Sequence, residues 1–184
     1  EALRVGDIPR VTIGVPVYNG DKHIAAMVDS LLSQDFGDYE LIISDNASTD
    51  ATPEICRAYV SRDRRIRYYR NAANIGAAGN YDRTFGLARG QYFKWAPHDD
   101  VYAPGYLRAC VETLDRGGER VVLAASRVLL IDDDGKVIRE HDDLMDFREH
   151  DPVQRLAHLL SDPKSWCHAV MGLMRTKVLR TTKL

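Results

Sequence analysis

The chain has 184 residues, of which 45% are hydrophobic and 28% are charged, as in ordinary globular proteins. This length suffices for one domain with a substantial core, and a net charge of -2 provides no overall basic field that would favour nucleic acid. No run of about eighteen apolar residues is present, which predicts no membrane-spanning helix. Three scattered cysteines without metal-ligand spacing, and no signal-peptide pattern, predict free thiols in a cytoplasmic protein, at most peripheral at the inner face of a membrane.

The first half of the chain alternates between strand and helix patterns. Residues 11–17 are β-branched and apolar, which predicts a buried first strand. Apolar residues at helical spacing from Ile24 to Leu32 predict a helix, and residues 39–44 predict a second buried strand. Thr52 followed by Pro53 is typical of an N-cap and the first position of the next helix.

The alternation continues toward the C-terminus. The sequence predicts strands at 66–69, 91–96, 121–131 and 169–174, and helices at 76–88, 104–114 and 152–160. Gly90 is expected to stop the helix that reaches Ala88. Residues 132–135 predict a turn into a short strand at 136–138, and the charged residues 139–151 predict a loop.

This alternation favours an α/β fold with a mostly parallel sheet and right-handed crossovers. Ligands in such sheets bind outside the carboxyl ends of the strands. Asp45 follows the predicted strand 39–44, and Asp99 and Asp100 follow the strand 91–96. We therefore expect these three carboxylates at the same edge of the sheet.

Asp99 and Asp100 form the most informative pair. Mg²⁺ or Mn²⁺ bound with a nucleotide takes one or two carboxylates together with phosphate oxygens, and two adjacent carboxylates at a strand end fit that need. The alternative is an acidic turn that caps the helix beginning near Pro104. The strand before the pair and Pro104 after it favour the metal site.

Other polar residues have both a ligand-binding and a structural interpretation. Asp45 and Asn46 could read the edge of a nucleobase, or form an Asx turn with residues 48–50. Tyr18 could stack on a base or pack at the strand exit. The Gly/Ala-rich residues 74–80 could bring backbone N–H groups to a phosphate, but they lack the spacing of a dinucleotide cofactor site.

Four further features carry weaker signals. We interpret His98 as a turn histidine, Arg83 as a surface charge and residues 132–134 as part of a hairpin turn. Residues 166–168 (Trp-Cys-His) could line an acceptor site or pack in a core.

Five motifs in order resemble family-two nucleotide-sugar glycosyltransferases of the GT-A fold. They are residues 11–20, 30–36 with 39–50, 74–76, 88–92, and the His-Asp-Asp motif with its flanks at 98–104. The resemblance covers residues 9–132 well and the rest loosely. It implies a Rossmann-like sheet with helices on both faces and a small antiparallel C-terminal part. Residues 1–132 would form the donor-binding region, and residues 133–184 would begin an acceptor-side region.

The resemblance also implies roles for individual residues. Pro16, Tyr18, Asp45, Asn46 and Asn74 would bind the nucleotide. Asp99 would contact ribose or metal, and Asp100 would bind Mn²⁺ or Mg²⁺ directly. The implied reaction is an inverting hexosyl transfer from a UDP-sugar, or from a dTDP- or GDP-sugar, to a saccharide or lipid-linked hydroxyl in cell-wall or polysaccharide synthesis.

The chain departs from the family pattern in places. Pro97 stands where the family often has Asp, and Tyr81-Asp82 stands where Arg-Asn is common. Residues 174–179 resemble the segment that precedes the catalytic base, which we expect beyond Leu184 in a longer enzyme. We therefore assign no catalytic base. Four acidic residues are possible substitutes that no pattern selects: Asp142, Asp143, Asp146 and Glu149.

Two other functions stay open at this point. A sugar-nucleotide nucleotidyltransferase would need a Gly-rich, basic loop after the first strand, and residues 18–21 (Tyr-Asn-Gly-Asp) argue against it. A non-catalytic nucleotide-binding domain is kept open by the unassigned base. The sugar, the acceptor and the oligomeric state do not follow from the sequence.

Overall fold

The computed structural model describes residues 8–141, 151–161 and 170–182. The chain divides into two compact units, one running to Ala124 and resuming at Leu173, the other spanning Ala125–Gly172. The predicted division at residue 132 concerns donor and acceptor regions and stays a prediction. Within the described ranges, no helix has the length and apolar character needed to cross a membrane.

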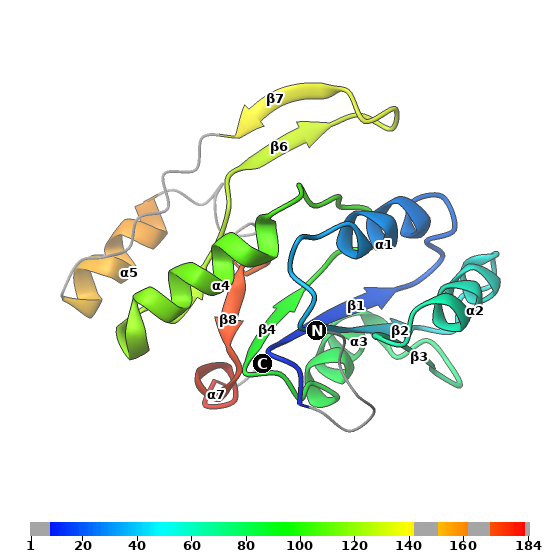
Figure 1. Cartoon of the computed structure of the whole chain (residues 1–184), viewed down its shortest axis with the longest axis horizontal. Coiled ribbons are helices and arrows are strands. Elements are labelled where there is room, and N and C mark those ends of the chain that lie inside the picture. The colour runs from blue at the N-terminus through cyan, green and yellow to red at the C-terminus, as the bar shows by residue number, and fades with distance from the viewer. Residues whose placement is uncertain (1–7, 142–150, 162–169, 183–184) are drawn as a thin grey trace. The chain divides into compact units, whose positions relative to one another are not determined.

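The first unit is built on a six-stranded sheet in the order β3-β2-β1-β4-β8-β5 (Figure 1). The four parallel strands are β1 (Val11–Val17), β2 (Tyr39–Asp45), β3 (Ile66–Arg70) and β4 (Tyr92–Trp95). The short strand β8 (Leu173–Arg175) lies antiparallel between β4 and β5 (Leu123–Ala124). The predicted mostly parallel sheet and the antiparallel C-terminal part are therefore confirmed.

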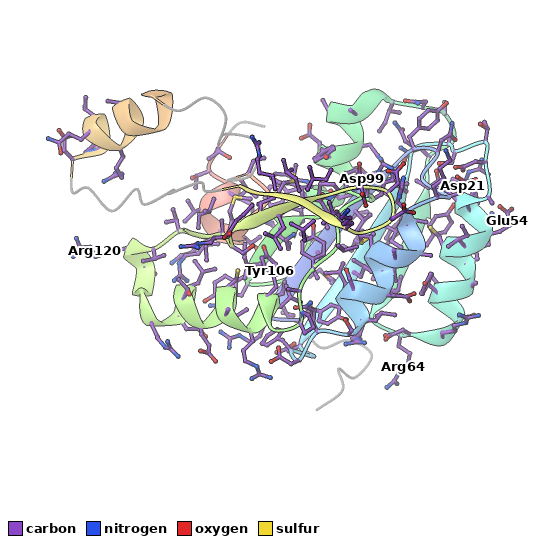
Figure 2. The ribbon with its side chains drawn as sticks, turned by 90° about the horizontal axis from the view of Figure 1, so that it is seen from above. Asp21, Glu54, Arg64, Asp99, Tyr106 and Arg120 are labelled. Carbon is purple, nitrogen blue, oxygen red and sulfur yellow. The ribbon has the colours of Figure 1, made fainter. Side chains whose placement is uncertain are left out.

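Helices cover both faces of this sheet. The main core joins the buried strand residues to α1 (Ile24–Leu32), α2 (Thr52–Arg62) and α4 (Tyr106–Arg116). The other face packs against α3 (Gly76–Gly86), where the Phe85 ring centre lies 5.0 Å from that of Phe93 and 6.0 Å from that of Trp95. Alternate residues of β4 thus enter different cores, which is why the strand carries aromatic residues on both faces. Charged side chains such as Glu54, Arg64 and Arg120 project outward (Figure 2).

Two short helical segments complete the first unit, η1 (Gly118–Arg120) after α4 and α7 (Thr176–Leu179) after β8. The second unit contains the antiparallel hairpin of β6 (Val128–Ile131) and β7 (Val137–His141), and the helix α5 (Pro152–Ser161). The predicted turn at 132–135 is confirmed, with Gly135 at a φ of 78° and its N–H donating to the Asp132 carbonyl.

The predicted strand 121–131 is wrong. Leu123 and Ala124 pair with β8, whereas residues 128–131 pair with β7 in the second unit. An apolar run indicates burial but not its pairing partner, so the sequence could not show the break. The predicted loop 139–151 also begins too early, because residues 139–141 pair with β6.

Two helix boundaries differ from the prediction for a physical reason. Thr52 does not cap α2: the helix begins at Thr52, whose hydroxyl accepts the Gly20 N–H at 2.9 Å. The helix α3 ends at Gly86, so Gly90 does not stop it. A Cβ at Gly90 would lie 2.6 Å from the Thr12 nitrogen, so glycine is required there by the close approach to β1.

Candidate functional site

Three adjacent parallel strands end at one edge of the sheet. β1 lies between β2 and β4, so Tyr18, Asp45 and the Asp99-Asp100 pair follow neighbouring strands at their carboxyl ends. The strand order reverses direction around β1, and this is where open α/β sheets bind their ligands. The predicted convergence of the three carboxylates at this edge is therefore confirmed by the topology.

Asp45 is fully buried at the end of β2. Its Oδ1 accepts the Ser48 N–H at 2.8 Å, and its Oδ2 accepts the Tyr68 hydroxyl at 2.6 Å and lies 3.3 Å from Arg70 Nε. Burial and the Asp45 charge raise the pKa of Tyr68 well above its ordinary value. The Arg70 side chain is 44% exposed, so the guanidinium is the solvent-facing group of this cluster.

Asn46 organises the loop that leads into α3. Its Oδ1 accepts from Asn71 Nδ2 at 2.8 Å and from the Ile75 N–H at 2.9 Å, while its Nδ2 donates to Asn74 Oδ1 at 2.8 Å. Asn80, on α3, is buried and accepts from Ser44 Oγ at 2.7 Å. Predicted residues Asn46 and Asn74 are thus in direct contact, and a network of asparagines holds residues 71–76 against the end of β2.

The exit of β1 is tied to the loop that follows β2. Pro16 is buried within the strand, whereas Tyr18 is 46% exposed. Asn19 has a φ of 51°; its N–H donates to Ser48 Oγ at 2.9 Å and its Oδ1 accepts the Thr49 N–H. These bonds confirm the structural interpretation of residues 48–50, and they leave the Tyr18 ring available at the edge.

Asp99 and Asp100 are both exposed in the turn that follows β4. Their charges add to burial in raising the pKa of Tyr81, which belongs to α3. No group of three or more His, Cys, Asp or Glu side chains in the described ranges could hold a metal ion. Two exposed carboxylates fit a cation that brings phosphate oxygens as further ligands rather than one held in a protein cage.

The turn itself packs on the β1 exit. The His98 ring lies so close to Gly20 that a Cβ there would be 2.6 Å from His98 Cδ2. This supports the interpretation of His98 as a turn residue that packs on the neighbouring loop.

A buried lysine lies on the core face of β4. Lys94 is 0% exposed, and its Nζ makes no hydrogen bond within the described ranges. Burial lowers the pKa of Lys94 to about 7, although the charge of Asp100 acts in the opposite direction. An unpaired ammonium in a core is costly, so its presence beside the acidic turn calls for an explanation.

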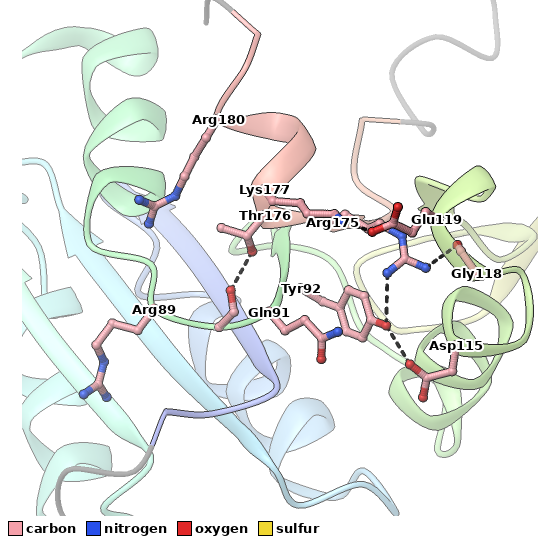
Figure 3. Close-up of a pocket in the computed structure, with 11 residues that line it drawn as sticks. Arg89, Gln91, Tyr92, Asp115, Gly118, Glu119, Arg175, Thr176, Lys177 and Arg180 are labelled. Carbon is pink, nitrogen blue, oxygen red and sulfur yellow. Dashed lines mark hydrogen bonds and ion pairs between the residues drawn. The ribbon is translucent and has the colours of Figure 1, made fainter.

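A separate pocket of about 580 Å³ opens near the start of β4, away from the carboxyl ends of the parallel strands (Figure 3). Arg175, at its wall, donates to the carbonyls of Leu114 at 2.6 Å and Gly118 at 2.5 Å. Asp115 accepts the Tyr92 hydroxyl at 2.6 Å. These groups bind one another and join α4 to β4 and β8, so we interpret the pocket wall as structural.

Sequence reasoning missed Arg70, Asn71 and Lys94, and it considered the backbone of residues 74–80 but not the side chain of Asn80. The two asparagines could have been suspected from the asparagine-rich run after the third strand, since amides close strand-end loops. A lysine within an aromatic strand was a visible anomaly. Arg83 is exposed, as predicted, and Cys56 and Cys110 are buried free thiols.

Some predicted features fall outside the described residues. These are Cys167, the rest of the 166–168 segment, and the four acidic residues considered as substitutes for the base, Asp142, Asp143, Asp146 and Glu149.

Proteins of similar sequence include glycosyltransferases. An uncharacterized glycosyltransferase of Rickettsia typhi is 32% identical over 124 residues, which are 67% of this chain and 38% of that protein. The succinoglycan biosynthesis protein ExoO of Rhizobium meliloti is 30% identical over 135 residues, 73% of this chain and 38% of that protein. The chain thus spans less than half the length of these relatives.

Solved structures share the fold. The first 349 residues of S. aureus TarS, in complex with UDP-GlcNAc, align with a TM-score of 0.68 at 21% identity over 93% of this chain and 46% of that one. The mannosyltransferase PcManGT from Pyrobaculum calidifontis, in complex with GDP-Man and Mn²⁺, aligns with a TM-score of 0.65 at 19% identity over 95% of this chain and 47% of that one. Both confirm the GT-A fold.

The sequence signature described as "Glycosyl transferase family 2" matches residues 12–182, nearly the whole chain. With this match, the fold and the strand-end site, the chain belongs to glycosyl transferase family 2.

Proposed function

We propose that this chain forms the donor-binding part of an enzyme that transfers a hexose from a nucleotide-diphosphate sugar to an acceptor hydroxyl. The observation that carries the proposal is the placement of Tyr18, Asp45 and the Asp99-Asp100 pair at the carboxyl ends of adjacent strands. An aromatic ring, a polar strand end and two carboxylates match the three chemical parts of such a donor: base, ribose and diphosphate.

The nucleotide would lie across the ends of β1 and β2. The half-exposed ring of Tyr18 offers a face for stacking, and Arg70 offers guanidinium donors beside buried Asp45. The asparagine network around Asn46 and Asn74 keeps the adjoining loop in place. We propose UDP as the nucleotide; one structural neighbour was solved with UDP-GlcNAc and another with GDP-Man, so both bases belong in the test.

Asp99 and Asp100 would hold Mn²⁺ or Mg²⁺ together with the diphosphate. Their exposure and adjacency fit that role, and a neighbour of the same fold was solved with Mn²⁺. When bound, the cation supplies positive charge at the departing diphosphate. The chain's own contribution is to hold two carboxylates at the end of β4 within reach of the nucleotide bound over β1.

We propose inversion at the anomeric carbon, in which the acceptor hydroxyl attacks opposite the departing nucleotide. Such a step needs a general base poised near the acceptor oxygen. No described residue is assigned to this role. The polysaccharide-related name of one relative supports a saccharide as the acceptor.

Calorimetric titration tests the donor site. UDP, dTDP and GDP would each be titrated in Mn²⁺ and in EDTA into the wild type, Asp100→Ala, and a control. Asp133→Ala is a matched control, because it removes an exposed carboxylate from the hairpin turn of the second unit. We expect one nucleotide to bind tightly with Mn²⁺ only, and Asp100→Ala to weaken that binding about 100-fold, roughly 3 kcal/mol.

Equal affinities in Mn²⁺ and EDTA would overturn the metal role of the acidic pair. Absence of binding for every nucleotide would overturn the proposed donor site in this chain. A loss of equal size in Asp133→Ala would show that the effect is unspecific.

A further inference from the structure

Lys94 has no role in the donor site described above. It is 0% exposed on β4, between Phe93 and Trp95, which face α3. Its side chain therefore points to the opposite face, into the main core with α1 and α4. An apolar side chain is expected at such a buried position, because a buried ammonium without a hydrogen bond costs free energy.

The partners of Lys94 are two aromatic rings. Nζ lies 4.0 Å from the ring centre of Tyr102 and 5.1 Å from that of Tyr106, and the two ring centres are 5.3 Å apart. The Tyr102 hydroxyl is buried and makes no hydrogen bond in the described part of the chain. The ring faces, rather than the hydroxyl, are thus what Tyr102 offers to Lys94.

Tyr102 lies in the segment that follows the acidic pair, and Tyr106 is the first residue of α4. Residues 96–105 contain no helix or strand, so side-chain contacts help to keep this segment in position. Ser30 Oγ, on α1, accepts the Tyr102 N–H at 3.1 Å, and Gln34 Nε2, just beyond the end of α1, donates to the Ala103 carbonyl at 2.8 Å. From β4, the contact is Lys94. The segment is thus held by a helix on one side and by a strand lysine on the other.

We infer that Lys94 is a positioning residue, whose buried ammonium anchors Tyr102 and Tyr106 to β4 and thereby fixes Asp99 and Asp100 for a cation-bound diphosphate. The ligand in this statement rests on the proposed function; the anchoring does not. The residues just before the pair belong to β4 or adjoin it, and those just after it are fixed by the lysine and α1. Both ends of the acidic turn are then tethered before any ligand arrives.

Hydrogen exchange tests the anchoring without any ligand. The experiment compares the wild type with Lys94→Met, Tyr102→Phe and Tyr102→Leu at pH 6, where the lysine carries its proton. Methionine keeps the length and removes the charge; phenylalanine keeps the ring; leucine removes it. We expect exchange of residues 99–106 to accelerate about fivefold in Lys94→Met and Tyr102→Leu, and to stay unchanged in Tyr102→Phe.

Residues 11–17 of the central strand report on global stability, so in each protein the exchange of residues 99–106 is compared with theirs. Unchanged exchange of 99–106 in Lys94→Met would overturn the inference. So would equal effects of Tyr102→Phe and Tyr102→Leu, because the ring would then not be the contact that matters.

A double-mutant cycle tests the consequence for the ligand. UDP binding at pH 6 would be measured with Mn²⁺ and with EDTA for the wild type, Lys94→Met, Asp100→Ala and the double variant. We expect Lys94→Met to weaken UDP binding about tenfold with Mn²⁺ and less than twofold in EDTA, with no further loss in the Asp100→Ala background. Lys94→Arg, which restores a cation, should recover part of the lost affinity.

Equal losses in both backgrounds would overturn the inference, because a merely structural lysine would act independently of Asp100. If the wild type binds UDP equally with and without Mn²⁺, the proposed metal site fails instead. The exchange comparison then still decides whether Lys94 anchors the segment.

Discussion

Glu40 and Lys94 are buried charged side chains of the same sheet whose surroundings differ sharply. Glu40, near the start of β2, is 2% exposed and fully paired: it accepts from Thr12 Oγ1 at 2.8 Å, Arg89 Nη2 at 2.7 Å and Arg67 Nη1 at 3.1 Å. Lys94, on β4, is equally buried but meets only ring faces. One charge is satisfied at the amino end of the sheet, and the other is left unsatisfied beneath the acidic turn.

This difference distinguishes residues that stabilise the fold from residues that serve ligand binding. At the amino end, Arg89 and Arg67 are paired with Glu40, and Gly90 packs closely against the backbone of β1. At the carboxyl end, Asp99 and Asp100 are exposed, and Lys94 is buried without a hydrogen bond within the described ranges. Features that cost stability without a local gain are expected at functional sites. Changes at the amino end should therefore affect folding, and changes at the carboxyl end should affect ligands.

The largest effect on stability is expected from Gly90→Ala. The new methyl group would lie 2.6 Å from the Thr12 nitrogen and 2.8 Å from the Val11 carbonyl carbon, which are backbone atoms that cannot rotate away. We expect a loss of about 3 kcal/mol in the free energy of unfolding, measured by urea denaturation. Gly86→Ala is the matched control, because its methyl group would meet no atom within 4 Å and should be neutral or slightly stabilising.

Glu40→Gln should come next. The amide keeps the shape but loses the charge that Arg89 and Arg67 face, and one of its groups becomes a donor. Because the two arginine side chains are 45% and 34% exposed, they can return to water. We expect a loss of about 2 kcal/mol in the same denaturation assay. If Glu40→Gln lost less free energy of unfolding than a control such as Glu112→Gln on α4, the paired charges around Glu40 would not be the stabilising feature.

Acid should remove the contribution of Glu40. Burial alone raises the pKa of Glu40, but hydrogen bonds from Arg89, Thr12 and Arg67 outweigh it and the pKa is lowered. Its contribution is therefore complete above the unfolded value of about 4.3 and is lost as the pH falls through the lower folded value. The stability difference between the wild type and Glu40→Gln should shrink in that window when unfolding is followed against pH.

Lys94→Met should have the opposite sign. Replacing a buried, unpaired ammonium by an apolar side chain of similar length should stabilise the fold by about 1 kcal/mol. Burial lowers the pKa of Lys94 to about 7, so the cost in the wild type is complete below that pH. It fades as the pH rises toward the unfolded value of about 10.4, and so should the advantage of the variant. If Lys94→Met were less stable than the wild type at pH 6, the contacts with the two tyrosine rings would outweigh the cost of burying the ammonium.

Asp99→Asn should have the smallest effect on folding. The side chain is exposed, so we expect a change within about 0.5 kcal/mol in the free energy of unfolding. Its effect should instead appear in nucleotide binding with Mn²⁺, measured by calorimetry. A large loss of stability with unchanged nucleotide binding would contradict the view that the carboxyl end of the sheet serves ligand binding and not folding.

The sequence by itself determined the parallel sheet and the edge at which its polar residues meet. Apolar, β-branched runs separated by helical periodicity fix which segments are strands, and the crossover rule then places their carboxyl ends together. Asp45, Asp99 and Asp100 could therefore be assigned to one edge without coordinates. The ordered motifs around them were sufficient to indicate the family.

The tertiary structure decided what depends on neighbours distant in sequence. Whether residues 121–131 form one strand depends on β8 and β7, which pair with its two halves. The requirement for Gly90 comes from the backbone of β1, and the bond of the Thr52 hydroxyl comes from Gly20. The burial of Asp45 and the aromatic contacts of Lys94 are likewise contacts across the fold. Local pattern encodes how much each segment is buried, whereas packing alone decides which atoms it meets.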